Sequence, residues 1–200
     1  MKEINDTNQN STDVITLEQA KNMKERPKGF LCKIKANRFA LQFLQFTLKD
    51  PESGKIFHDM EFDEHKNEEL LIDDDQYPQE MLDVFDEMRY IHYEFPISFL
   101  KAKVLSCTLK FKVGDLPVKN LILIENHYFK DQRIAHYEFK LPFCPPNTKN
   151  TAEYIYEVPE LDEKIIQEIS SKGLNTYSDT FFFVNGELIM HNKAEYSFTS

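Results

Sequence analysis

Residues 104–113 read VLSCTLKFKV, and this stretch decides the fold class because its apolar and polar residues alternate strictly. One face carries only apolar side chains: Leu105, Cys107, Leu109, Phe111 and Val113. Serine, threonine and lysine side chains occupy the other face. A period of two with one apolar face is typical of an antiparallel strand that is buried on one side. The stretch GDLP at 114–117 then supplies turn chemistry, so we expect further strands on both sides.

Similar alternation recurs along most of the chain, at 91–99, 135–143 and 152–158. Near the C-terminus the apolar runs TFFFV and ELIM flank Asn185-Gly186, a strong signal for a tight hairpin. Between 38 and 48 the apolar phase shifts, which a β-bulge would explain. Pro96 indicates an edge strand or a bulge. About eight or nine short strands of this kind predict an all-β sandwich or barrel.

Two short helices are expected within this β-rich chain. Residues 16–25 fit a helix with Thr16 as N-cap and Gln19 at the capping-box position. Residues 162–171 fit a second helix, whose apolar stripe begins at Leu161 and which Gly173 can end. We therefore divide the chain into a flexible N-terminal segment, 1–28, that includes the first helix, and a β-sandwich, 29–200.

An acidic insertion at 59–87 interrupts the strands. It holds 13 acidic and one basic side chain, a net charge of −12, whereas the rest of the chain has a net charge of +2. We interpret it as a long loop with one helical patch made by Met81, Leu82, Phe85 and Met88. The overall charge of −10 argues against nucleic acid as a partner and against simple adsorption to an anionic membrane.

The remaining composition excludes several other classes of protein. Three scattered cysteines, Cys32, Cys107 and Cys144, do not form a disulfide framework and favour a reducing compartment. The N-terminal residues contain no apolar stretch and no run of 18 apolar residues exists, so we expect neither a signal peptide nor a membrane span. Lys2 follows Met1, so the chain itself should not be myristoylated.

The stretch LILIENHYFKDQ at 121–132 raises the question of function, because Glu125 and His127 follow an apolar run without a turn residue. Alternation places both on the same face as Leu121 and Leu123. If that face looks inward, two polar groups lie at the end of an apolar wall. The simpler interpretation, that the strand emerges into water at Glu125, is favoured by alternation alone, because a buried carboxylate needs a partner.

Catalysis is a weaker interpretation of these residues. It would pair Cys144 with His127 or His136, but nucleophilic catalysis needs a base within hydrogen-bond reach and a third group to orient it. The sequence contains no nucleophile elbow, no HExxH, no glycine-rich phosphate loop and no Cys/His ligand spacing. We therefore expect no enzyme, no metal and no cofactor, and favour an aromatic-lined binding cavity. A plain interaction sandwich with a filled core stays open as an alternative.

Three longer stretches carry a family resemblance: ENHYF at 125–129, FCPPNTKNTAEYIYEVPEL at 143–161 and TYSDTFFFVNGELIMHNKAEYSF at 176–198. They closely resemble the uncoordinated one-nineteen (retina protein four) family of acyl-binding chaperones. That family belongs with the delta subunit of the rod cyclic-GMP phosphodiesterase, a GDI-like solubilising factor. LKDPESG at 48–54, RYIHYEFPISFLK at 89–101 and FKVGDLPVKN at 111–120 extend the similarity over about 14–198. MHNKAEYSF favours the acyl-binding over the prenyl-binding branch, which remains the alternative.

The resemblance implies an immunoglobulin-like β-sandwich with a hydrophobic pocket between its sheets. It implies a carrier that takes up the N-terminal myristoyl or lauroyl chain of cargo proteins. Cytosolic transport toward cilia or flagella and cargo release by a GTP-bound Arf-like GTPase are also implied. The lipid-binding positions of the family fall on Phe46, Leu48, Tyr93, Phe99, Leu105, Tyr137, Val158, Phe182 and Tyr196. Glu125 and His127 match the polar positions around the cargo's N-terminal glycine.

Three of these positions depart from the usual pattern of the family. Val158 stands in place of a usual Phe, Tyr137 in place of a Phe, and Phe182 in place of a Tyr. These differences change the width and depth expected of the pocket, so the preferred acyl chain length stays open.

Overall fold

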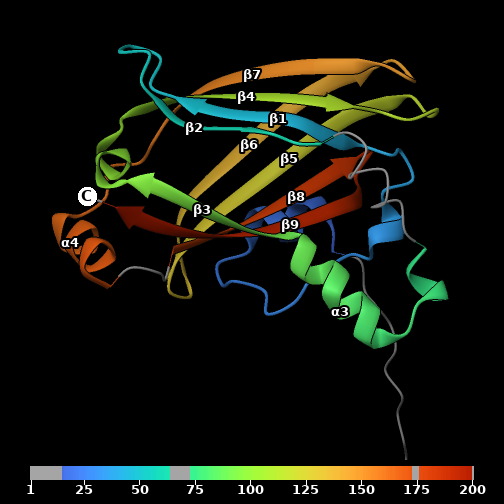
Figure 1. Ribbon diagram of the computed structural model, residues 1–200, viewed down its shortest axis with the longest axis horizontal. Helices are drawn as coiled ribbons and strands as arrows, with labels where there is room; N and C mark the ends of the chain where they lie inside the picture. Colours follow the sequence, from blue (N-terminus) through green and yellow to red (C-terminus); the bar gives the residue numbers. More distant parts are fainter. Residues whose placement is uncertain (1–14, 64–72, 173–175, 200) are drawn as a thin grey trace, which may run out of the picture.

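Two β-sheets lie face to face and enclose the interior of the protein (Figure 1). The computed structural model describes residues 15–63, 73–172 and 176–199. In spatial order the smaller sheet contains β2 (Ile56–Glu61), β1 (Gln42–Lys49), β4 (Val104–Lys112) and β7 (Lys149–Glu157). The larger sheet contains β3 (Tyr90–Pro96), β9 (Glu187–Thr199), β8 (Thr176–Val184), β5 (Val118–Phe129) and β6 (Gln132–Cys144). The predicted all-β sandwich is therefore confirmed, with one parallel pair, β3 and β9, among antiparallel ones.

The stretch VLSCTLKFKV forms β4 and lies in the middle of the smaller sheet, between β1 and β7. Its apolar face points into the sandwich, and Leu105 and Phe111 are both buried. The phase shift in the first strand is a bulge, because the pairing of β1 with β4 changes register between Phe43 and Gln45. Asn185 and Gly186 both adopt positive φ, 52° and 83°, in the predicted hairpin between β8 and β9.

Two strands differ from the prediction. The strand expected over 91–99 ends at Pro96, and the chain continues as a 3₁₀ helix, η4 (Ile97–Lys101). β3 is an edge strand of the larger sheet, where a proline without an N–H is tolerated. β2 was not predicted at all, and its last three residues belong to the acidic insertion. It escapes a search for alternation because, as the outer strand of the smaller sheet, it is only partly buried.

The short helices form where the sequence indicates them. α1 (Leu17–Asn22) begins with the predicted capping box of Thr16 and Gln19, although it ends three residues before 25. The helical patch of the acidic insertion is α3 (Gln79–Met88), which follows η3 (Asp74–Gln76), and the last helix is α4 (Glu163–Lys172). Gly173 lies outside the described residues. Within the described part of the chain, no helix is long and apolar enough to cross a membrane.

The segment that precedes η1 (Ile34–Ala36) covers the outer face of the larger sheet, where Ala20 packs beside Ile124 and Phe181. The side-chain amide of Asn126 donates to the carbonyl of Ala20 at 3.0 Å, which ties α1 to β5. This cover explains why LILI contains four successive aliphatic residues, since β5 is apolar on both faces. Residues 1–14 lie outside the described part, so the flexible segment and its boundary at 28 stay predictions.

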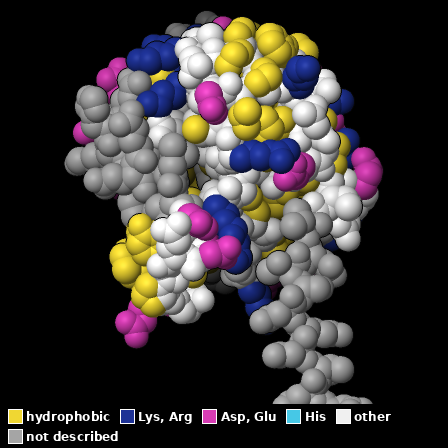
Figure 2. Space-filling view, turned by 90° about the vertical axis from the view of Figure 1, so that its right-hand side faces the viewer, with side chains coloured by type: hydrophobic (Ala, Val, Ile, Leu, Met, Phe, Trp, Pro, Cys, Tyr) yellow, Lys and Arg dark blue, Asp and Glu magenta, His cyan; other side chains and the backbone are white. Residues whose placement is uncertain are grey.

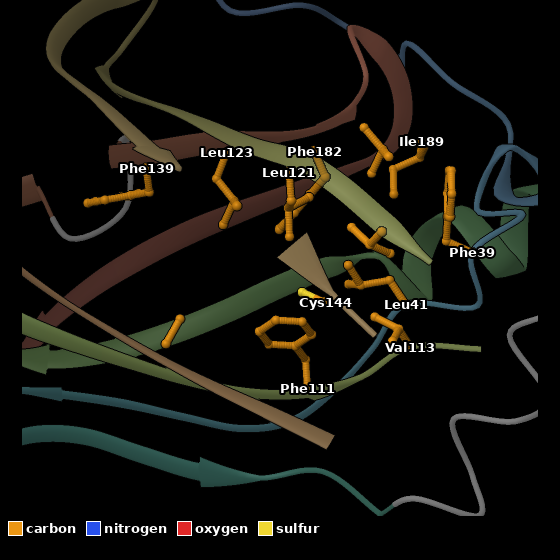
Figure 3. Close-up of a cluster of buried hydrophobic side chains, with 13 residues drawn as sticks. Phe39, Leu41, Phe111, Val113, Leu121, Leu123, Phe139, Cys144, Phe182 and Ile189 are labelled. Atoms are coloured by element: carbon orange, nitrogen blue, oxygen red, sulfur yellow. The ribbon is translucent and has the colours of Figure 1, made fainter. Parts of the chain in front are cut away.

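A cluster of aliphatic and aromatic side chains fills the end of the sandwich at which β5 begins (Figure 3). Phe39, Phe111, Leu121, Cys144 and Ile189 converge there from both sheets. All five are at most 5% exposed. The first residues of β5 therefore lie against a closed core, and the space between the sheets opens from Leu123 onward.

Candidate functional site

A cavity lies between the sheets along the second half of β5. Its volume is about 170 Å³. A single buried water needs only roughly 10–15 Å³, so the cavity is far larger than a packing defect. Aromatic and aliphatic side chains supply most of its lining, including Phe43, Phe95, Leu109, Tyr156 and Leu161. The cavity weighs against a plain interaction sandwich with a filled core.

All eleven positions that the sequence singled out line this one cavity. The smaller sheet contributes Phe46, Leu48 and Leu105. The larger sheet contributes Tyr93, Glu125, His127, Tyr137, Phe182 and Tyr196. Two come from connecting segments: Phe99 from η4 and Val158 from the residue after β7. The structure thus brings the predicted set together, while their role in lipid binding stays a prediction.

Aromatic rings contact one another around the lining and hold its shape. Tyr93 stacks on Tyr196 with ring centroids 5.6 Å apart, and Phe95 stacks on Phe99 at 4.3 Å. Such pairs add stability beyond the area they bury. Their side chains have few rotatable bonds, so the cavity is preformed and loses little freedom when a ligand enters.

Glu125 and His127 face the cavity, which resolves the alternative that alternation left open. His127 Nε2 lies 2.8 Å from Glu125 Oε1, and the two side chains are 21% and 26% exposed respectively. The imidazole also stacks on Tyr196 and meets the edge of Tyr137. The carboxylate therefore has the partner that burial demands, and both groups remain accessible to a ligand.

The Glu125 carboxylate raises the pKa of the tyrosine and cysteine side chains around it. Burial raises the pKa of Tyr93, Cys107 and Tyr137, and the nearby negative charge of Glu125 raises each of these pKa values further. The two phenols therefore stay protonated and keep an O–H to donate to a ligand. The Cys107 thiol stays protonated as well and is no nucleophile.

The catalytic pairing of Cys144 with a histidine is wrong. Cys144 pairs with Val118 at the beginning of β5, nine residues from His127 and therefore about 30 Å away along the strand. Its side chain is fully buried in the core, and burial raises the pKa of its thiol. His136 contacts Asn126 at 2.7 Å instead. Among the described residues, no group of three His, Cys, Asp or Glu side chains could hold a metal ion.

Sequence reasoning missed a row of hydroxyl groups on the inner face of β8. Thr176, Ser178 and Thr180 all line the cavity. The Ser178 hydroxyl lies 2.6 Å from the Tyr196 hydroxyl. The buried Thr176 hydroxyl has no hydrogen-bond partner within the described structure. The alternation in TYSDTFFFV could have revealed this row, since its polar positions continue the inward face of Phe182.

The outer face of the same strand carries a buried ionic cluster formed by Arg26, Asp179, His191 and Lys193. Asp179 Oδ1 accepts hydrogen bonds from Lys193 Nζ at 2.6 Å and from His191 Nε2 at 2.8 Å. The backbone N–H of Leu31 donates to His191 Nδ1, so this imidazole is neutral with its proton on Nε2. Burial lowers the pKa of His191, in agreement with that form. The cluster fixes the N-terminal segment directly behind the wall of the cavity.

The chain is similar in sequence to a known family and to several known proteins. Residues 35–198 match the family model described as "GMP-PDE, delta subunit". "Protein unc-119" of Caenorhabditis briggsae is 36% identical over 171 residues, which cover 86% of this chain and 74% of the relative. "Protein unc-119 homolog B" of Danio rerio is 35% identical, covering 92% of this chain and 74% of its own. The human protein of the same name is 33% identical, and the aligned residues cover 93% of this chain and 72% of the human protein.

Proposed function

The chain belongs to the unc-119 family within the GMP-PDE delta subunit family, and we propose that it carries acylated proteins by enclosing their lipid. In this proposal the cavity takes up the N-terminal myristoyl or lauroyl chain of a cargo protein. Glu125 and His127 meet the backbone of the first cargo residues. Family membership confirms that the protein is not an enzyme. The observation that carries the proposal is the aromatic cavity with one carboxylate–imidazole pair in its wall.

The energetics of the cavity favour such a ligand. A myristoyl chain offers roughly a dozen CH₂ groups, and burying each is worth about 0.8 kcal/mol, so the gross gain is on the order of 10 kcal/mol. A membrane binds the same chain with a constant of only about 10⁴ M⁻¹. A preformed pocket that also hydrogen-bonds the peptide competes with that affinity, because the bilayer offers no equivalent partners.

Binding of two lipidated peptides tests the proposal against its alternative, a prenyl-binding factor of the delta-subunit type. We expect a fluorescent myristoyl-glycyl peptide to bind at least about tenfold more tightly than a farnesyl-cysteine peptide of equal length. The physical reason is that Glu125 can accept a hydrogen bond from the amide at the start of the acylated peptide. Fluorescence polarisation at equal ionic strength measures both. Tighter binding of the farnesyl peptide would show that the protein is a prenyl-binding factor instead.

A second prediction concerns Glu125 itself. The Glu125→Ala variant should bind the myristoyl-glycyl peptide about 10- to 100-fold more weakly, the usual effect of losing a hydrogen bond to a charged group. Free myristic acid has no peptide amide to donate, so its affinity should change much less. Calorimetric titration of both ligands measures the difference, with Glu125→Gln as the control that keeps size and an acceptor. Equal losses for both ligands would mean that Glu125 only supports the fold.

Tight enclosure of the lipid requires a means of release. The family resemblance implies that a GTP-bound Arf-like GTPase releases the cargo. It also implies that the carrier moves through the cytoplasm toward cilia or flagella. A GTPase that prefers the emptied carrier lowers cargo affinity by the same coupling free energy, typically about 1–3 kcal/mol. Sheet edges such as β7 and β6 offer backbone groups to which a GTPase strand could add.

A further inference from the structure

Two turns meet at the closed end of the sandwich and form a defined surface, which we call the tip: residues 113–117 and 145–148. The backbone N–H of Asn147 donates to the carbonyl of Gly114 at 2.7 Å, and that of Val113 donates to Thr148 at 3.1 Å. The backbone N–H of Gly114 donates in turn to Phe39 at 2.8 Å. These bonds join three parts of the chain and hold the two turns of the tip together.

Large apolar side chains are exposed on and beside the tip. Phe143 is 51% exposed and Leu116 is 40% exposed, although both belong to residue types that are usually buried. Prolines at 117, 142, 145 and 146 are also exposed. Exposed apolar side chains that gather in one place mark an interaction surface.

Lysines surround these apolar side chains. The two stretches 110–120 and 139–152 hold five lysines and one acidic residue, a net charge of +4 within a chain of −10. Lys140 also forms an ion pair with Glu138, just outside these stretches. Lys119 lies opposite Phe143 in the pairing of β5 with β6, and Lys112 lies opposite Lys149 in the pairing of β4 with β7. Figure 2 looks at this end of the molecule and shows hydrophobic side chains at its top, with lysine and arginine side chains and some acidic ones around them.

We propose that the tip docks on the surface of an anionic membrane. Phe143 and Leu116 enter the interface between headgroups and acyl chains, and the surrounding lysines meet the anionic headgroups. An apolar centre with a basic rim is the combination that such a surface recognises. A fluid bilayer adapts to side chains that two turns present. The average charge of the chain opposes adsorption, but this surface has the opposite sign.

Docking through the tip is independent of lipid uptake. The closed core around Leu121 and Cys144 separates the tip from the cavity. A docked molecule therefore keeps its cavity unobstructed, and the proposal goes beyond the carrier function without resting on it.

Vesicle binding by the full chain without cargo tests the proposal. We expect co-sedimentation with vesicles of phosphatidylcholine and phosphatidylserine at low salt, loss of binding at high salt, and none to phosphatidylcholine alone. One lysine near an anionic surface is worth about fivefold in affinity, so Lys119→Glu with Lys140→Glu should weaken binding by at least about 25-fold. Phe143→Ser should weaken it by about tenfold.

Matched controls change the same chemistry elsewhere. Lys101→Glu with Lys103→Glu alters the net charge equally, about 30 Å away where β4 begins, and Ile155→Ser removes a side chain that is 65% exposed on β7. Both should bind vesicles within about threefold of wild type. Absence of wild-type binding to anionic vesicles at low salt, or equal losses in the controls, would overturn the proposal. The proposal would also be overturned if the protein bound poly-glutamate, and if this binding were abolished by Lys119→Glu but left intact by Phe143→Ser. That result would mean that the tip recognises an acidic protein.

The same variants separate this proposal from the carrier function. Phe143→Ser and the double lysine variant should bind the myristoyl-glycyl peptide with wild-type affinity and unfold at the wild-type temperature. Loss of vesicle binding with peptide binding intact supports the tip. Loss of both together would show a general defect of the fold and would contradict a separate docking surface.

Discussion

Replacing Asp179 with alanine is expected to destabilise the protein by about 3–5 kcal/mol, because the change leaves a buried ammonium without its counter-ion. Lys193 is nearly inaccessible, and its remaining acceptor is the carbonyl of Pro27 at 2.7 Å. Burial already lowers the pKa of Lys193, and the Asp179 charge opposes that shift. Chemical unfolding followed by circular dichroism measures the loss, which corresponds to roughly 10 °C in melting temperature for a chain of this size.

A double variant supplies the control for this prediction. Lys193→Met removes the positive charge while keeping an unbranched side chain, so Asp179→Ala with Lys193→Met should regain at least half of the lost stability. The reason is that the desolvation free energy of a buried ion pair is nearly as large as the attraction between its two charges. A buried charge without a partner has the desolvation penalty and no compensating attraction. Stability of Asp179→Ala within 1 kcal/mol of wild type would show that water reaches the cluster and that it contributes little.

The ionic cluster also shows where sequence reasoning stops. Asp179, His191 and Lys193 lie on two neighbouring strands and meet across the pairing of β8 with β9, but their fourth partner, Arg26, comes from a segment far away in sequence. A continuous apolar run such as FFFV at 181–184 in β8 indicates burial on both faces. No pattern within a strand, however, identifies the segment that covers its outer face or the charged side chains that meet there.

The inner face was more accessible to prediction. Strict alternation placed Tyr93, Leu105 and Tyr137 on apolar faces, and a sandwich has only one interior into which such faces can point. Glu125 was the difficult case. Alternation predicted the face of β5 on which its side chain lies, but not the hydrogen-bond partner that stabilises a partly buried carboxylate. The hydrogen bond to His127, two residues along the same face, supplies that partner. Alternation places the Thr176 hydroxyl on the same face as Phe182, but it does not show that this face lines a cavity.

Filling part of the cavity should weaken lipid binding strongly without damaging the fold. Cys107 lies on the inner face of β4, lines the cavity and is only 7% exposed. In a Cys107→Phe variant the added ring occupies the space of about three to four CH₂ groups of a ligand. At about 0.8 kcal/mol each, this loss weakens myristoyl-peptide binding by roughly 100-fold. Because the ring enters empty space, the free energy of unfolding should stay within about 1 kcal/mol of wild type.

The matched control places the same substitution in the closed core. Cys144 is fully buried among side chains that leave no comparable space, so Cys144→Phe should cost about 1–3 kcal/mol of stability through overpacking. Cys144→Ala, by contrast, should retain full affinity for the myristoyl-glycyl peptide, since no ligand reaches that position. Fluorescence titration and urea unfolding of the three variants give two independent readouts. Wild-type lipid affinity in a folded Cys107→Phe protein would place the acyl chain outside this cavity, because a chain that shares the space of the added ring cannot bind unchanged.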